Sequence, residues 1–214
     1  MGCKTEQEWH RERAKGIGGS DAAAILGRNP YMSNVDLWEI KTGRRQQEDI
    51  SDKPCVVFGK KAEDPIREIF KLDHPEYEVI HEEYGNKHNP DFPFIRGSFD
   101  GELIEKATGR RGILEIKTTN ILQSMQKEKW NDQVPDNYFC QVLHYFLVEP
   151  KAEFAILKAR LRMEYNGQIR ATIRHYRFER SDYLKDLELL KVKEIEFWDK
   201  VLNDVRPNLI LPPI

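Results

Sequence analysis

The chain has 214 residues, of which 39% are hydrophobic and 33% charged, with a formal net charge of −2. These values predict a globular protein with a sizeable core, and we expect a single domain over residues 1–214. No apolar run approaches the roughly 20 residues that span a bilayer, and the N-terminus lacks a signal-peptide core, so we expect a cytoplasmic protein without a membrane partner. Cys3, Cys55 and Cys140 have no paired spacing, which argues against a disulfide framework or a zinc site.

The N-terminal segment predicts a short polar helix at residues 5–15, followed by a glycine-rich loop at residues 16–21. Ser20 is the expected N-cap of a two-turn helix at residues 22–26. A glycine-rich loop that opens a helix exposes backbone N–H groups, which suit an anion such as phosphate. Taken alone, a tight turn is the simpler interpretation, and the loop is not a P-loop because no Gly-Lys-Ser/Thr follows.

Two more helices are expected next. Ser33 is placed to cap a helix at residues 34–42, and a longer amphipathic helix should begin near Gly59, since Pro65 is tolerated only near a helix start. Glu63 then falls in the first turn, where the simplest interpretation is a solvated acid favoured by the helix dipole. The expected core face of this helix consists of Ala62, Ile66, Ile69 and Phe70.

The most informative stretch is residues 94–118, after an expected strand at residues 77–84. It predicts two strands joined by a turn around residues 106–111. Because side chains alternate along a strand, Glu115 and Lys117 are expected on one face, opposite to Ile116.

Three charged side chains should converge on this hairpin. Asp100, expected on the first strand, should lie within a residue or two of Glu115 or Lys117 on the second. Two carboxylates suit Mg²⁺, and a lysine beside them can orient or deprotonate a water for in-line attack on phosphorus. The alternative is an ordinary Glu115–Lys117 salt bridge. We favour the metal site because the other two acid-x-Lys sequences, at residues 39–41 and 149–151, fall in an expected helix and a proline loop.

Helices are expected at residues 121–129 and 136–148 and again from Ser181 onward. On the second of these, Gln141 lies between two tyrosines on one stripe, where it could reach the hairpin or face water. The expected inward face of the last helix consists of Leu184, Leu187, Ile195, Trp198 and Val201.

A second hairpin is expected from two strands, at residues 154–163 and 168–178, across an Asn-Gly turn. Residues 158–180 carry seven Lys or Arg against two Glu, although the net charge of the whole chain does not indicate a nucleic-acid binder. One face of the first strand turns basic along its length. That face is either solvated or a contact for a nucleic-acid backbone.

These motifs occur in the order of a known family. W-H-x-x-R precedes GIGGSDAAAILG, and FGKKAEDP, GSFDG, ILEIKTT and YFCQVLHYFLV follow. Over about residues 9–148 the chain resembles the lambda-exonuclease-like viral recombinases of phages and prophages, a branch of the PD-(D/E)xK nucleases. Phe99 stands where the superfamily name has Pro, a common departure. The resemblance implies an α/β (α+β) fold with a restriction-endonuclease-like core, in which helices flank a mixed central β-sheet.

The resemblance also implies a metal site. Asp100 and Glu115 match the metal-binding carboxylates, and the Ile116 carbonyl matches a further ligand. Lys117 matches the water-activating lysine. Glu63 matches a helical acid that supports the metal, which replaces the interpretation of Glu63 as a solvated residue.

Three further residues match the family by position. Gln141 matches a glutamine beside the metal, and Arg13 and Ser20 match the residues that bind a 5′-terminal phosphate. Together with Mg²⁺, or Mn²⁺ as a substitute, these residues imply 5′→3′ digestion of one strand of linear double-stranded DNA. The product would be a 3′ overhang for a single-strand annealing protein. Members often form homotrimeric rings, and a phage or prophage enzyme would act in the cytoplasm of its bacterial host.

Three alternatives remain at this stage. An endonuclease could use the same carboxylates on internal phosphodiesters. A non-catalytic nucleic-acid-binding protein could keep the hairpin acids merely paired with Lys117. A nucleotide-binding protein using residues 16–21 is disfavoured by the missing P-loop lysine.

Overall fold

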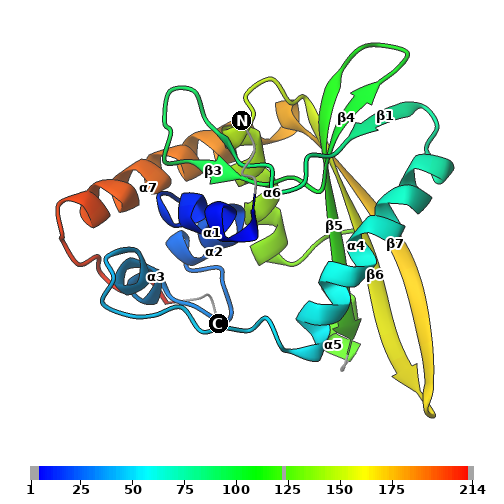
Figure 1. Ribbon diagram of the computed structural model, residues 1–214, viewed down its shortest axis with the longest axis horizontal. Helices are drawn as coiled ribbons and strands as arrows, with labels where there is room; N and C mark the ends of the chain where they lie inside the picture. The colour runs from blue at the N-terminus through cyan, green and yellow to red at the C-terminus, as the bar shows by residue number, and fades with distance from the viewer. Residues whose placement is uncertain (1–4, 122–123, 212–214) are drawn as a thin grey trace.

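The computed structural model describes residues 5–121 and 124–211. Over these ranges its helices are α1 (Glu6–Ala14), α2 (Gly19–Ile25), α3 (Asn34–Lys41), α4 (Pro54–Asp73), α5 (Ser124–Glu128), α6 (Asp136–Val148) and α7 (Leu184–Leu202), with a 3₁₀ turn, η1 (Arg180–Tyr183). Its strands are β1 (Tyr77–Ile80), β2 (Lys87–His88), β3 (Arg96–Gly97), β4 (Gly101–Glu105), β5 (Arg111–Ile121), β6 (Phe154–Tyr165) and β7 (Gln168–Glu179). Figure 1 shows their arrangement.

A five-stranded sheet in the order β1-β4-β5-β6-β7 forms the centre of the molecule. The β5–β6 pair is parallel, and the β1–β4, β4–β5 and β6–β7 pairs are antiparallel. This confirms the expected mixed sheet. A parallel pair needs a crossover connection, and α6 provides it between β5 and β6.

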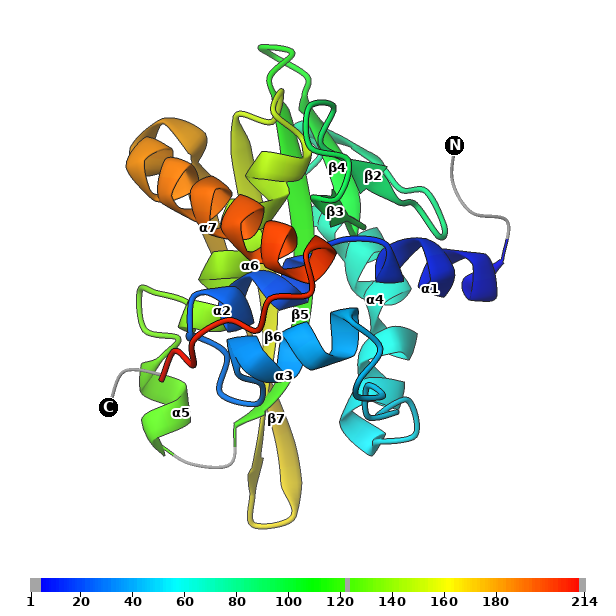
Figure 2. The ribbon, with the colours of Figure 1, turned by 90° about the vertical axis from the view of Figure 1, so that its left-hand side faces the viewer.

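Helices cover both faces of this sheet, and the alternation along β5 decides which residues each helix meets. Leu114 and Ile116 belong to an apolar cluster with Phe70 of α4, whereas Ile113 belongs to a larger cluster with Phe146 of α6. Helix α4 therefore lies on one face, while α6, with α2 and α7 beyond it, lies on the other (Figure 2). The alternation expected for this strand is confirmed.

Helix α4 begins at Pro54, five residues before the expected start. A proline in the first turn loses no hydrogen bond, which favours this start. Pro65 lies inside the helix and removes the donor for the Lys61 carbonyl; both residues are exposed, so water can satisfy that carbonyl. Ile69 is 46% exposed, so its expected place in the core was wrong, and Arg67 is buried on this helix instead.

Other differences lie at element ends. The last helix, α7, is preceded by the 3₁₀ turn rather than starting at Ser181, and Leu184 is exposed, whereas Leu190 and Phe197 are buried. Strand β1 ends at Ile80, and the short β2 strand forms in an expected loop. Of the helix expected at residues 121–129, the structure shows α5, while residues 122–123 lie outside the described part.

Across the described residues, no helix combines the length and apolarity that a membrane span requires.

Candidate active site

The β4–β5 hairpin positions Asp100 opposite Glu115. The register pairs Gly101 with Leu114, and Asp100 is the residue before β4 rather than a strand residue as expected. The Ile116 N–H donates a 2.6 Å hydrogen bond to Asp100 Oδ2. The expected convergence on this hairpin is therefore confirmed by the register and by this bond.

Glu115 is held by two neighbours. Lys117 Nζ lies 2.5 Å from Glu115 Oε1, and Gln141 Nε2 donates to the same oxygen at 2.8 Å. Gln141 Nε2 also contacts the Tyr145 hydroxyl oxygen at 2.7 Å, so Gln141 faces the hairpin rather than water. Glu115 is only 4% exposed, and within the described part of the chain its Oε2 has no hydrogen-bond partner.

Helix α4 adds a third acid and a buried base. Arg67 Nη1 lies 3.5 Å from Glu63 Oε1 and donates to the backbone oxygen of Asp100 at 3.3 Å. Arg67 also pairs with Asp64 and is 2% exposed. We did not anticipate Arg67 from the sequence, although its spacing of four residues from Glu63 places both side chains on one helix face.

Electrostatic interactions in this cluster oppose full ionisation. Burial raises the pKa of Asp100 well above its ordinary value, and the negative charges of Glu115 and Glu63 raise it further. Burial also raises the pKa of Glu63, against the opposing charge of Arg67. Burial disfavours the Lys117 ammonium, but the charges of Glu115 and Asp100 outweigh burial and raise the pKa of Lys117. The positive charges of Lys117 and Arg67 therefore do not fully offset the negative charge of the three carboxylates.

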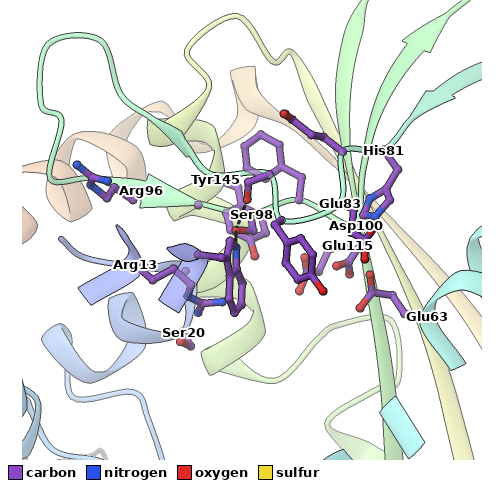
Figure 3. Close-up of a pocket in the computed structure, with 18 of the residues that line it drawn as sticks. Arg13, Ser20, Glu63, His81, Glu83, Arg96, Ser98, Asp100, Glu115 and Tyr145 are labelled. Carbon is purple, nitrogen blue, oxygen red and sulfur yellow. Dashed lines mark hydrogen bonds between the residues drawn. The ribbon is translucent and has the colours of Figure 1, made fainter. Parts of the chain in front are cut away.

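A cavity of about 740 Å³ joins this cluster to the N-terminal helices. Arg13 and Ser20 line one side of it, and Asp100, Glu115 and Glu63 line the other (Figure 3). Lys117 and Gln141 also line it, so every side chain singled out from the sequence contributes to one cavity.

Arg13 reaches the cavity from α1. Its guanidinium carbon lies 4.4 Å from the centre of the Trp9 ring, and Trp9 Nε1 donates to Ser98 Oγ at 2.8 Å. Ser98 in turn donates to the Gly85 carbonyl at 2.6 Å. In the described residues the Arg13 guanidinium has no carboxylate partner, so it remains available to an anion. The bond between Trp9 and Ser98 joins residues 89 positions apart, and no local pattern predicted it.

Ser20 lies beside the cavity because α2 packs very closely on α6. A Cβ on Gly19 would lie 2.7 Å from a Tyr145 ring carbon and 2.9 Å from Gln141 Cγ, so only glycine fits there. The N-cap of α2 is Gly18, not Ser20 as expected. The helix starts earlier because the Asp21 carboxylate accepts a 2.9 Å hydrogen bond from the Gly18 N–H. One N–H expected to bind an anion is thus already used, while Ser20 is exposed to the cavity.

The donor set fits a hard divalent cation. Three carboxylates, from Glu63, Asp100 and Glu115, line one part of the cavity, and a buried Glu115 oxygen lacks a partner among the described residues. On the α4 side, the ligand atoms of Glu63, Asp64 and His81 lie within 4.8 Å of one another. A bound cation would relieve the mutual repulsion that raises the pKa of Asp100.

Comparison with known proteins decides the family. Residues 8–152 match the model of the YqaJ-like viral recombinase domain. The chain belongs to this family. It is also 32% identical over 211 residues to the uncharacterized protein YqaJ of Bacillus subtilis (strain 168), an alignment that includes 96% of this chain. The chain spans only 59% of the length of that relative.

Solved structures share the fold of this YqaJ-like chain. An alkaline exonuclease from Laribacter hongkongensis, LHK-Exo, superposes with a TM-score of 0.67 at 15% identity, covering 93% of this chain and 94% of that one. LHK-Exo in complex with dAMP gives the same TM-score and coverage at 16% identity. These likenesses confirm the predicted fold class, including the mixed sheet flanked by helices.

Proposed function

We propose that this chain is a metal-dependent deoxyribonuclease that digests one strand of linear duplex DNA from a 5′-phosphorylated end. The observation that carries the proposal is the shared cavity, in which Arg13 and Ser20 face a cluster of three acids. Arg13 has no carboxylate partner within the part of the chain that the structure describes. An anion-binding group beside a cation-binding group suits a substrate with two phosphates, one terminal and one scissile. The solved complex of the fold relative with dAMP, a mononucleotide, is consistent with this kind of substrate.

Each side chain has a proposed task. Asp100 and Glu115, which line the cavity, would hold Mg²⁺ or Mn²⁺, and Glu63 would support them. The Ile116 carbonyl is added as a ligand by family resemblance. The cation would supply Lewis-acid stabilisation of the charge that develops on the phosphate oxygens. The Ile116 N–H and Arg67 keep Asp100 in place from its two sides, one at the carboxylate and one at the backbone oxygen.

Lys117 would orient the attacking water. It would accept the proton of that water as the neutral amine, a form that a cation on Asp100 and Glu115 would favour by offsetting the two charges that raise the pKa of Lys117. For this Lys117 would have to leave Glu115, with which it is paired, and a cation held by Asp100 and Glu115 would compete for that carboxylate. Gln141 donates to the same oxygen, Glu115 Oε1, which would keep the carboxylate fixed as Lys117 moves toward the water.

At the other end of the cavity, Arg13 and Ser20 would bind the terminal phosphate. A monoester phosphate carries more negative charge than an internal diester, so this pair would prefer phosphorylated ends. Digestion would then proceed 5′→3′ and leave a 3′ overhang for a single-strand annealing protein. By family resemblance we also propose one nuclease domain over residues 1–214, a homotrimeric ring, and a phage or prophage enzyme acting in the bacterial cytoplasm.

A cleavage assay tests the proposal against its rivals. Linear duplexes and covalently closed circles are incubated with Mg²⁺, and in parallel with EDTA. The exonuclease should degrade only linear DNA, and only with metal. Nicked circles would indicate an endonuclease with the same acids, and intact DNA in every lane would indicate a binding protein.

A further inference from the structure

Basic side chains gather on the β6–β7 hairpin, outside the cavity. Between residues 158 and 177 the acidic residue is Glu164 alone, while the whole chain is slightly negative. The basic residues in this stretch are Lys158, Arg160, Arg162, Arg170, Arg174 and Arg177. The hairpin extends past the helices that cover the rest of the sheet (Figure 1). Its Asn166-Gly167 turn has positive φ at both residues, the two-residue turn predicted from the sequence.

Two of these arginines share one aromatic ring. The guanidinium carbons of Arg160 and Arg162 lie 5.4 Å and 4.0 Å from the ring centre of Phe58, on α4. In the described part of the chain, Arg160 Nη1 and Arg162 Nε are buried and have no hydrogen-bond partner. Two other basic residues of this hairpin have acidic partners: Arg177 pairs with Glu179, and Lys158 pairs with Asp73. We call Arg160, Arg162 and Phe58 the arginine clamp.

The clamp brings two positive charges together, and no carboxylate of residues 5–121 or 124–211 pairs with either of them. A ring attracts each guanidinium, but the two cations repel one another, and their unmade hydrogen bonds are costly where water is excluded. An anion with several oxygens would satisfy both groups. The planar guanidinium fork matches a phosphate better than it matches any neutral group.

The clamp lies close to the acids of the cavity. Phe58 precedes Glu63 by five residues of α4, which is about 7.5 Å along the helix axis. Arg160 and Arg162 pair with Thr118 and Asn120 of β5, one and three residues beyond Lys117, or roughly 3–10 Å along the strand. Their contact with Phe58 places them on the α4 face of the sheet, opposite to the face that carries Lys117. Each DNA strand carries one phosphate per about 3.4 Å of helix axis, so these offsets along α4 and β5 correspond to a few phosphates.

We propose that Arg160 and Arg162, held by Phe58, bind the phosphate backbone of DNA a few nucleotides away from the scissile bond. This inference rests on the proposed function for its substrate, but it concerns binding and not the chemical step. The clamp secures the nucleic acid between successive cleavages, while the cavity holds the end.

The salt dependence of binding tests the clamp. A fluorescent 5′-phosphorylated duplex is titrated with the full chain in EDTA, by anisotropy, over a series of KCl concentrations. The slope of log K against log salt is negative, and each lost phosphate contact reduces its magnitude by about 0.9. Arg160→Gln/Arg162→Gln should therefore reduce the magnitude by about 1.8 and weaken binding. The control is Lys191→Gln/Lys193→Gln on α7, which removes the same charge from lysines paired with Glu188 and Glu196 and should keep the wild-type slope.

A second measurement separates this inference from the nuclease proposal. In single turnover with Mg²⁺ and saturating enzyme, Arg160→Gln/Arg162→Gln should cleave within about twofold of the wild-type rate, because binding is then no longer limiting. A wild-type slope in a variant that still cleaves would overturn the clamp and leave the nuclease intact. If the wild type never cleaves, yet the slope depends on the arginines, the nuclease fails and the clamp stands.

Two further results of these experiments also bear on the clamp. If the double variant does not fold, Arg162→Gln alone is used, with an expected change in slope of about 0.9. If the substitutions abolish self-association in sedimentation and leave the slope unchanged, the surface contacts another copy of the chain, which overturns the proposal.

Discussion

Lys117 Nζ and Glu115 Oε1 lie 2.5 Å apart, at the point where β5 meets the cavity. This contact is the salt bridge that the sequence offered as an alternative to a metal site. It is compatible with both interpretations, because a lysine beside a metal-free carboxylate pairs with it in either case. The second Glu115 oxygen, buried and without a partner among the described residues, favours the metal site.

Kinetics separates the two roles of Lys117. If Lys117 activates water, Lys117→Ala should lower the single-turnover rate by about 10²-fold or more, since a general acid or base contributes that much. Mg²⁺ binding, measured by calorimetry, should persist because the carboxylates remain. Lys117→Arg, which keeps the charge but cannot accept a proton, should be equally slow. A purely structural salt bridge predicts instead that the arginine variant retains nearly full activity.

Removing a carboxylate should stabilise the metal-free protein. Burial and the charges of Glu115 and Glu63 raise the pKa of Asp100, so its ionised form is unfavourable in the fold at neutral pH. Asp100→Asn keeps an oxygen for the Ile116 N–H and removes one negative charge. Its thermal midpoint in EDTA should therefore exceed that of the wild type, while cleavage is lost.

Adding metal should reverse that order. Mg²⁺ should raise the wild-type midpoint, because a ligand that binds only the folded state stabilises it, and should have little effect on Asp100→Asn. Asp91→Asn, in an exposed loop, serves as the control and should respond like the wild type. Equal metal stabilisation of Asp100→Asn and wild type would remove Asp100 from the metal site.

A buried pair away from the cavity should make stability depend on pH. His144 Nδ1 lies 2.7 Å from Glu194 Oε1, and His144 Nε2 lies 2.7 Å from the Arg96 carbonyl oxygen. Burial disfavours the charged ring, but the charge and hydrogen bond of Glu194 outweigh burial and raise the pKa of His144 above 6.5. The stabilisation is therefore complete below about pH 6.5, the pKa of an unfolded histidine, and is lost as pH rises through the higher folded value.

Urea unfolding at several pH values measures this effect as a difference. Burial lowers the pKa of His81 and His175, and these histidines contribute with the opposite sign. We therefore compare the wild type with His144→Gln, in which His81 and His175 remain. The free-energy advantage of the wild type should shrink as pH rises above 6.5. An advantage that is constant over this range would contradict the titration of His144.

Local patterns predicted the hairpin well. Alternation along β5 and the turn around residues 106–111 predicted the register closely enough to bring Asp100 to Glu115, because both depend on residues near one another in sequence. The Asn166-Gly167 turn was predicted for the same reason. Helix α4 was predicted less well, since Pro65 normally marks a helix start and only its exposed position makes it tolerable here.

Contacts between distant segments could not be predicted from local patterns. Trp9 meets Ser98, and Gly19 allows α2 to approach Tyr145, through packing that no short window of sequence contains. Family resemblance, and not periodicity, brought Glu63 and Arg13 into the site. By pattern alone Glu63 was a solvated helix residue, whereas the structure half-buries it beside Arg67.

The preference for the DNA end depends on Arg13. Because its guanidinium lies against Trp9 and has no carboxylate partner in the described residues, a terminal phosphate would be its strongest ligand in the cavity. Arg13→Ala should therefore slow digestion of 5′-phosphorylated duplex markedly and digestion of 5′-hydroxyl duplex much less. Arg11→Ala removes the same charge from an exposed position of α1 that does not line the cavity, and should leave both rates unchanged. Initial rates on the two substrates decide the matter: an Arg13→Ala protein that keeps the wild-type preference for phosphate would place the phosphate pocket elsewhere.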